Sequence, residues 1–184
     1  MYPKLFQSIF TNTDISNIIS YIDTNIEDFG TLSSENYWSG RTLFFNSLKN
    51  DSIKNLILKN LTYSINQIIT NLSNPLYCEH LSIARWPTGY DLKPHADAEN
   101  PVGHPPHPYP WRDFACITFL NNNFDGGILY FPNQNIEINP IPGQTIMFPG
   151  TLEYLHGVTE ITKGSRYTIA SFLTYNSSKS SINL

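Results

Sequence analysis

Two stripes of isoleucine and leucine in the first part of the chain recur at the spacing of a helix face. The first predicts a helix with Thr11 or Thr13 as its N-cap. The second predicts a helix over 51–72, which Asn74-Pro75 ends because proline cannot continue a helix. We expect both apolar faces to pack against a sheet. The stripes comprise Ile15, Ile18, Ile19, Ile22 and Ile26, followed by Ile53, Leu56, Ile57, Leu61, Ile65, Ile68, Ile69 and Leu72.

From residue 76 onward the apolar positions follow the pattern of short strands, with glycine, proline and asparagine between them. This pattern predicts a mainly β (α+β) fold, a sandwich or jelly roll with the N-terminal helices packed on one sheet. We expect one domain over 1–184, with a helical support region over 1–75 and a β core over 76–176. The expected extended segments are 5–10, 31–47, 76–86, 113–120, 127–131, 135–138, 144–149, 153–157 and 166–175.

Candidate chemistry gathers at His95-x-Asp97. Side chains two residues apart at the end of a strand point the same way, so both could bind one metal ion. A third ligand could come from His156, which Arg166 follows ten residues later. Two histidines and one carboxylate form a facial triad that leaves open positions on iron(II). Taken alone, His156 could equally be a hydrogen-bonded loop residue, but the joint arrangement favours the metal site.

Residues 97–111 interrupt the strand pattern with five prolines. We therefore predict a long loop that leaves directly from the metal pair, where lids and substrate clamps commonly lie. His104 and His107 in this loop are interpreted as solvated residues. A second metal site would need a carboxylate or thiol at matching spacing.

Composition narrows the classes of function. A hydrophobic share of 40% is typical of a globular protein, and a net charge of −4 gives no basic surface for nucleic acid. No apolar run approaches the length of a membrane span, and the N-terminus lacks the layout of a signal peptide. We therefore expect a cytoplasmic protein with no membrane or nucleic-acid partner. Cys78 and Cys116 are expected to be reduced core residues.

Further motifs surround the three candidate ligands in a defined order. Gly89 and Pro94 flank His95-x-Asp97, then come Thr118-Phe-Leu-Asn, Phe124-x-Gly-Gly-x-Leu-x-Phe-Pro, Gly143, Phe148-Pro149, His156-Gly-Val and Gly164-x-Arg-Tyr-Thr168. This series resembles the Fe(II)- and 2-oxoglutarate-dependent dioxygenases of the prolyl 4-hydroxylase-like branch. The resemblance implies a double-stranded β-helix (jelly roll), with His95, Asp97 and His156 holding Fe(2+). It also implies 2-oxoglutarate and O2 as co-substrates, with ascorbate as a supporting reductant.

The resemblance also implies roles for residues around the metal. Arg166 is expected to bind the distal carboxylate of 2-oxoglutarate, because a guanidinium is bidentate and stays charged. Thr168 faces the same way on the strand and could add a hydroxyl donor. Trp86 and Leu92 stand where many prolyl hydroxylases carry tyrosines, and Phe119 replaces a tyrosine of related cosubstrate pockets.

Two residues match positions that bind the peptide and line the proline slot in the family, namely Arg112 and Phe172. We assign Trp86 and Phe119 to the cosubstrate pocket, and Arg112, Leu92 and Phe172 to the substrate side. Trp86 and Phe172 are also expected to offer ring faces to a proline. The leading hypothesis is a hydroxylase of prolyl residues in a protein or peptide. The alternatives are the same chemistry on a free amino acid or other small molecule, and a catalytically inactive jelly-roll binding module.

Overall fold

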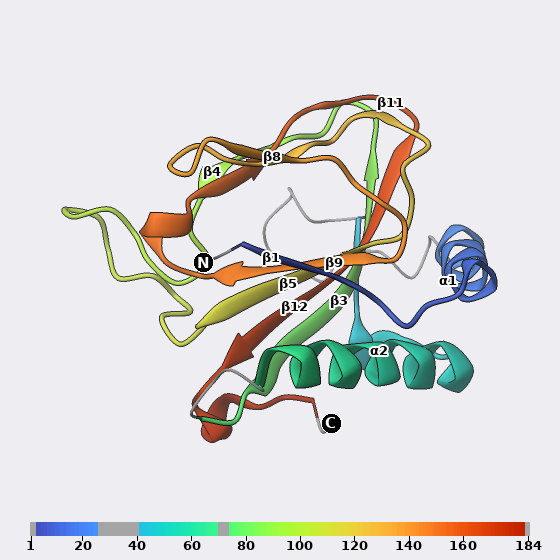
Figure 1. The fold of residues 1–184 in the computed structure, drawn as a ribbon, viewed down its shortest axis with the longest axis horizontal. Coiled ribbons are helices and arrows are strands. Elements are labelled where there is room, and N and C mark those ends of the chain that lie inside the picture. Colours follow the sequence, from blue (N-terminus) through green and yellow to red (C-terminus); the bar gives the residue numbers. More distant parts are fainter. Residues whose placement is uncertain (1–2, 26–40, 70–73, 183–184) are drawn as a thin grey trace.

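The computed structural model describes residues 3–25, 41–69 and 74–182. Two antiparallel sheets face each other, and the helices lie on the outer side of the larger sheet (Figure 1). The larger sheet has the order β1-β9-β5-β12-β3-β2. Its strands are β1 (Lys4–Gln7), β9 (Gln144–Pro149), β5 (Phe114–Phe119), β12 (Ser165–Thr174), β3 (Tyr77–Pro87) and β2 (Thr42–Phe44).

The smaller sheet has the order β4-β10-β7-β8. Its strands are β4 (Leu92–His95), β10 (His156–Val158), β7 (Leu129–Phe131) and β8 (Ile136–Ile138). A further pair is formed by β6 (Asp125–Gly126) and β11 (Ile161–Lys163). The two facing sheets form the predicted jelly roll, so the fold class is confirmed.

Two helices cover the outer face of the larger sheet, as the apolar stripes predicted. Helix α1 (Asn12–Thr24) begins after Thr11, whose hydroxyl accepts a hydrogen bond from the Asp14 amide at 3.2 Å. The Asp14 carboxylate in turn accepts one from the Thr11 amide at 2.8 Å, which completes a capping box. Helix α2 (Asp51–Ile69) is the second predicted helix. No helix within the described ranges is long and apolar enough to cross a membrane.

The fold has two hydrophobic layers. The layer under the helices joins their isoleucines to the outward-facing side chains of the larger sheet, such as Ile83 and Ile169. The second layer lies between the sheets and contains phenylalanines of both, including Phe119, Phe131 and Phe148. Cys78 and Cys116 are buried free thiols, as expected. Burial raises the pKa of each thiol to about 12, so neither is a reactive thiolate at neutral pH.

Several boundaries differ from the sequence prediction. Of the segment 31–47, only Thr42–Phe44 is a strand in the described part, and Phe45–Ser47 turns into a short 3-10 helix. The expected strand 153–157 is instead a 3-10 turn, Leu152–Tyr154, followed by β10. The pattern did not predict β4 as a separate strand, because it contains Pro94 and lies at a sheet edge where proline is tolerated. Ile26, residues 31–40 and Leu72 lie outside the described residues.

Candidate functional site

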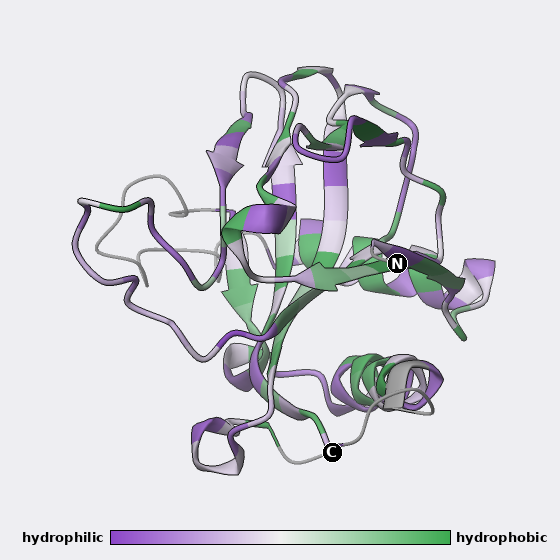
Figure 2. Cartoon of the chain, turned by 60° about the vertical axis from the view of Figure 1, so that its left-hand side comes forward, coloured by the Kyte–Doolittle hydropathy of each residue, from purple (hydrophilic) through white to green (hydrophobic). Residues whose placement is uncertain are grey.

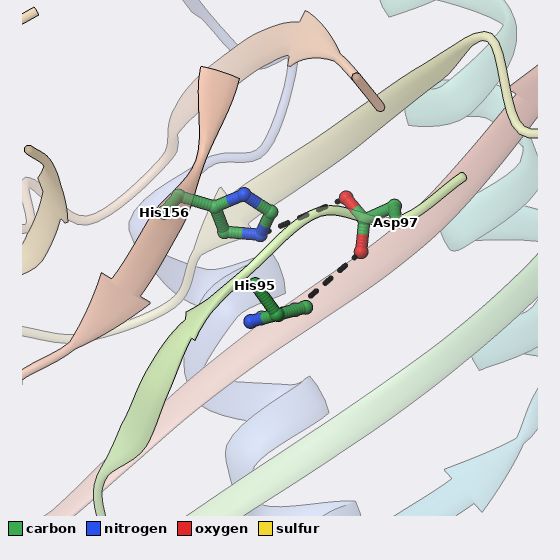
Figure 3. Close-up of side chains that lie close together, drawn as sticks. All are labelled: His95, Asp97 and His156. Atoms are coloured by element: carbon green, nitrogen blue, oxygen red, sulfur yellow. Dashed lines mark ion pairs between the residues drawn. The ribbon is translucent and has the colours of Figure 1, made fainter. Parts of the chain in front are cut away.

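The three predicted metal ligands meet at one end of the smaller sheet. His95 is the last residue of β4 and pairs with His156, the first residue of β10. Asp97 lies just past β4, and each of its carboxylate oxygens is 3.6 Å from the Nε2 atom of one histidine (Figure 3). All three ligand atoms lie within 4.8 Å of one another, and no other such group of three occurs in the described residues. The sequence prediction of a third ligand from a distant segment therefore agrees with the fold.

The hydrogen bonds of the two imidazoles leave Nε2 free for a metal. His95 Nδ1 lies 3.0 Å from the Lys93 carbonyl oxygen, and His156 Nδ1 lies 3.1 Å from that of Tyr154. Because a carbonyl only accepts, each Nδ1 must carry the proton, and each Nε2 presents a lone pair. This is the tautomer that a metal-binding histidine requires.

The electrostatics of the buried ligands suit a cation. Burial raises the pKa of the Asp97 carboxyl, but the adjacent His95 and His156 and the charge of Arg112 outweigh that effect and lower the pKa. Burial lowers the pKa of His156, which favours the neutral ring that binds metals. Asp97 Oδ2 is buried without a hydrogen-bond partner among the described residues. A divalent metal ion fits this donor set, since it would satisfy the orphaned oxygen and both Nε2 atoms.

Gly150 fixes Asp97 and both ends of the proline-rich loop. Its carbonyl accepts hydrogen bonds from the amides of Asp97 at 3.0 Å and Ala98 at 2.9 Å. Its own amide donates to the Asp113 carbonyl at 3.0 Å, beyond the other end of the loop. A Cβ at Gly150 would lie 2.3 Å from the Arg112 carbonyl oxygen, so only glycine allows this approach. The loop over 97–111 leaves from this point and extends away from the sheets, mostly as hydrophilic chain (Figure 2).

Arg166 provides a buried positive charge on the inner face of the larger sheet. It is 2% exposed, and burial lowers its pKa to about 10, so the guanidinium is still charged at neutral pH. Its Nε atom has no hydrogen-bond partner among the described residues. The guanidinium lies 5.5 Å from the Trp86 ring centroid and 5.4 Å from that of Phe119. A buried, aromatic-walled cation with an orphaned donor fits a carboxylate ligand.

The other residues assigned to the cosubstrate lie around Arg166. Thr168 is two positions along β12 and pairs with Phe119, so its side chain is on the same face as Arg166. Trp86 pairs with Arg166 across β3 and β12. Leu92, assigned to the substrate side, packs against both the cluster that contains Trp86 and the cluster between the two sheets.

The two residues assigned to the substrate side, Arg112 and Phe172, contact each other. The Arg112 guanidinium lies 3.8 Å from the Phe172 ring centroid and 3.9 Å from that of Tyr109 in the loop. Its Nε donates to Glu79 Oε2 at 2.9 Å. Tyr109 and Glu79 were missed from the sequence. Neither belongs to a recognisable motif. Glu79 reaches Arg112 from a distant strand, whereas Tyr109 is joined to Arg112 by a turn in which the Arg112 amide donates to the Tyr109 carbonyl at 3.2 Å.

Trp86 and Phe172, the two rings expected to face a proline, lie far apart. Trp86 pairs with Arg166, whereas Phe172, six residues further along β12, pairs with His80. Six residues of strand span roughly 20 Å. The two rings therefore lie at opposite ends of the β3–β12 ladder and cannot enclose the same proline.

The family model of the 2OG-Fe(II) oxygenase superfamily matches residues 81–174, which include all three metal ligands and Arg166. The chain belongs to this superfamily. The family expected from the motifs is thus confirmed, and with it the cofactor set of Fe(2+), 2-oxoglutarate and O2.

Among the curated relatives, prolyl 3-hydroxylase 1 of Gallus gallus is 38% identical over 74 residues, which is 38% of this chain. The match spans 10% of that relative's length. Among solved structures, the viral collagen prolyl hydroxylase of Paramecium Bursaria Chlorella virus-1 superposes with a TM-score of 0.69 at 15% identity, covering 96% of this chain and 97% of that one. A Trichoplax adhaerens prolyl hydroxylase in complex with a hypoxia inducible factor peptide fragment gives 0.66 at 17% identity, covering 94% and 83%. At these identities, the similarity to the two solved structures shows a shared fold.

The histidines of the loop do not join the metal group. His104 is exposed, and His107 bonds the Tyr109 amide through Nδ1 at 3.2 Å. Neither lies in a group of three potential ligands among the described residues.

Proposed function

We propose that this protein is an Fe(II)- and 2-oxoglutarate-dependent hydroxylase of prolyl residues in a protein or peptide. The observation that carries the oxygenase chemistry is the pairing of a facial His-Asp-His group with the buried cation of Arg166, whose Nε has no hydrogen-bond partner among the described residues. His95, Asp97 and His156 would hold the metal, and Arg166 with Thr168 would bind the distal carboxylate of 2-oxoglutarate. When bound, iron and 2-oxoglutarate reduce dioxygen, so that a substrate C–H becomes C–OH and 2-oxoglutarate becomes succinate and CO2.

The chain's own residues hold and orient these groups. The carbonyls of Lys93 and Tyr154 orient the two imidazoles, and Gly150 fixes the backbone of Asp97. Trp86 and Phe119 exclude water from the guanidinium of Arg166, which strengthens its attraction for a carboxylate.

Three observations support a prolyl peptide as the substrate. The relatives with 32–38% identity are named prolyl 3-hydroxylases. Phe172 contributes an aromatic ring to the region around Arg112, Phe172 and Tyr109, which we call the substrate mouth, and such a ring suits a proline. Arg112 donates only one hydrogen bond to the described protein, through Nε, so its terminal nitrogens remain available for peptide carbonyls. An extended, proline-rich segment binds with little loss of entropy because its conformation is preformed.

The test is to incubate proline-rich peptides with the enzyme, Fe(II), 2-oxoglutarate and air. Mass spectrometry should show one added oxygen on a proline, with stoichiometric succinate. Comparison with 3- and 4-hydroxyproline standards then gives the position, and the sequence relatives favour carbon 3. If a broad peptide set stays unmodified while a free amino acid or metabolite is oxidised, the small-molecule alternative replaces the prolyl assignment. No succinate with any compound would instead favour an inactive binding module.

The cytoplasm remains our proposed location. The two buried free thiols, Cys78 and Cys116, are consistent with a reducing compartment.

A further inference from the structure

Strand β3 carries one extra residue at Glu79. On β12, Phe172 pairs with His80, but the next residue, Leu173, pairs with Cys78. Glu79 is therefore left without a partner in the ladder, which defines a β-bulge. Bulges re-aim side chains and are common beside active sites.

The bulge decides which face of the sheet receives this carboxylate. Residues Leu81 and Ile83 of β3 point toward the helices and belong to the outer hydrophobic layer. Strict alternation would send Glu79 to that same apolar side, where an unpaired carboxylate is costly. With the bulge, Glu79 instead reaches Arg112 at the mouth, with Oε2 2.9 Å from Nε.

The backbone at the bulge is held by the end of the chain. The amides of Ser181 and Ile182 donate to the Cys78 carbonyl at 3.0 and 3.3 Å, and the Ser181 hydroxyl donates to the Glu79 carbonyl. The Glu79 side chain is 14% exposed and that of Arg112 is 12% exposed. The carboxylate is thus a fixed, largely desolvated group and not a mobile surface charge.

The ion pair between Glu79 and Arg112 neutralises the charge of the substrate mouth but leaves hydrogen-bond donors of the guanidinium available. Arg112 is stacked between Phe172 and Tyr109, so the guanidinium has a single orientation, and its ion pair offsets the positive charge. Burial and the charge of Arg112 lower the pKa of the adjacent His80 to about 4, so this ring adds no charge at neutral pH. A peptide would meet aromatic faces and hydrogen-bond donors with little net charge.

We propose that Glu79 determines the charge selectivity of the substrate mouth. By neutralising Arg112, it makes the mouth accept an uncharged segment around the target proline and disfavour an acidic one. This inference rests on the proposed prolyl hydroxylase function and specifies its substrate class. Glu79 acts through Arg112 and is a positioning residue, not a catalytic one.

The experiment uses pairs of proline-rich peptides that differ only in a glutamine or a glutamate near the target proline, moved through the flanking positions. In the wild type, kcat/KM should favour the glutamine peptide at the sensitive position by about tenfold or more, as expected for partly desolvated like charges. Glu79→Gln should remove or reverse this preference. Glu79→Asp keeps the charge and should retain the preference with a higher KM. The matched control is Glu137→Gln on the exposed side of β8, which should behave as the wild type.

A binding measurement provides a readout that is independent of turnover. Peptide affinities are measured without oxygen, with Mn(II) and 2-oxoglutarate present, and should show the same reversal in Glu79→Gln. The preference should also weaken as ionic strength rises. Equal peptide ratios in the wild type and Glu79→Gln, with proline hydroxylation intact, would overturn this inference alone. If the wild type neither binds nor hydroxylates any of the peptides, the proposed function fails, and the inference falls with it.

Discussion

The carbonyl of Gly150 accepts a hydrogen bond from the backbone amide of Asp97, so the position of a metal ligand depends on a residue that is distant in the sequence. Asp97 lies beyond the end of β4 and has no ladder to hold it. The hydrogen bonds that the Asp97 and Ala98 amides donate to the Gly150 carbonyl replace the missing strand contacts. This relationship leads directly to the first prediction.

Gly150→Ala should weaken metal binding and lower the stability of the protein. The added methyl group would lie 2.3 Å from the Arg112 carbonyl oxygen, so the base of the loop must shift, at a cost of about 1–3 kcal/mol or more. Thermal unfolding and Mn(II) binding by equilibrium dialysis measure the two effects. Gly103→Ala is the control: nothing lies within 4 Å of its Cβ, and its φ of +91° makes the change costly only locally. Equal metal affinity in both variants would contradict the role of Gly150.

Removing any one of the metal ligands should abolish tight metal binding. His95→Ala, Asp97→Ala and His156→Ala each leave only two protein ligands, which hold a divalent ion poorly. Metal content after dialysis and succinate production check this expectation. Full turnover by any of the three variants would show that the site is assigned wrongly. His104→Ala, an exposed loop histidine, is the matched control and should bind metal normally.

Arg166→Ala should raise the concentration of 2-oxoglutarate needed for turnover by a hundredfold or more. Loss of a buried charge partner is worth about 3–5 kcal/mol. Arg166→Lys should recover only part of the affinity, since an ammonium lacks the bidentate fork. Binding can be followed by titration calorimetry with Mn(II) present. The control is Arg85→Ala, which loses a contact with Asp23 on the outer face and should leave the affinity for 2-oxoglutarate unchanged. An unchanged affinity in Arg166→Ala would exclude Arg166 from the pocket.

His80 should make the protein less stable in mild acid. The folded protein protonates this ring only near its lowered pKa of about 4, whereas the unfolded chain does so near 6.5. Between these values the unfolded state binds more protons, so stability rises with pH across the window and falls on acidification. The contribution is on the order of 3 kcal/mol between pH 7 and pH 4. The free energy of unfolding of His80→Gln, measured with urea, should change less with pH than that of the wild type by this amount. The same pH dependence in both proteins would refute the prediction.

The loop over 97–111 should move in its middle and not at its ends. Asp97 and Ala98 are tied to Gly150, and the Glu99 carboxylate accepts a bond from the Leu152 amide at 2.7 Å. Amide hydrogen exchange should therefore be slow at the amides of Asp97, Ala98 and Leu152 and fast at those of Val102 and Gly103. A true substrate should slow exchange in the middle through closure. The same exchange rates with and without substrate would argue against a lid.

The sequence predicted those features that depend on local pattern or on motifs. The isoleucine stripes gave both helices, and the order of motifs identified His95, Asp97, His156 and Arg166. These motifs were sufficient to predict the site because binding a metal ion or a carboxylate requires particular side-chain types, which can be recognised in the sequence.

Features that depend on register between distant strands could not be predicted. The bulge at Glu79 exists only because β12 pairs with β3 in a shifted register. Nothing in the local sequence marks Glu79 as the extra residue of its strand. The contact of Arg112 with Phe172 likewise joins the end of the loop to the distant strand β12, and no local signal specifies that pairing. The separation of Trp86 and Phe172 was missed because residue spacing alone does not show how far apart two rings lie.

The loop that begins at Asp97 and returns to Asp113 is fastened at both ends to Gly150. Its length and composition can therefore change without displacing the strands that carry the metal ligands, since closing a longer loop between fixed ends costs little. In evolution, insertions or exchanges in this segment would alter which substrates reach the mouth while the oxidation chemistry stayed intact. The same arrangement makes the loop a suitable segment to exchange when a new substrate range is engineered onto an unchanged catalytic framework.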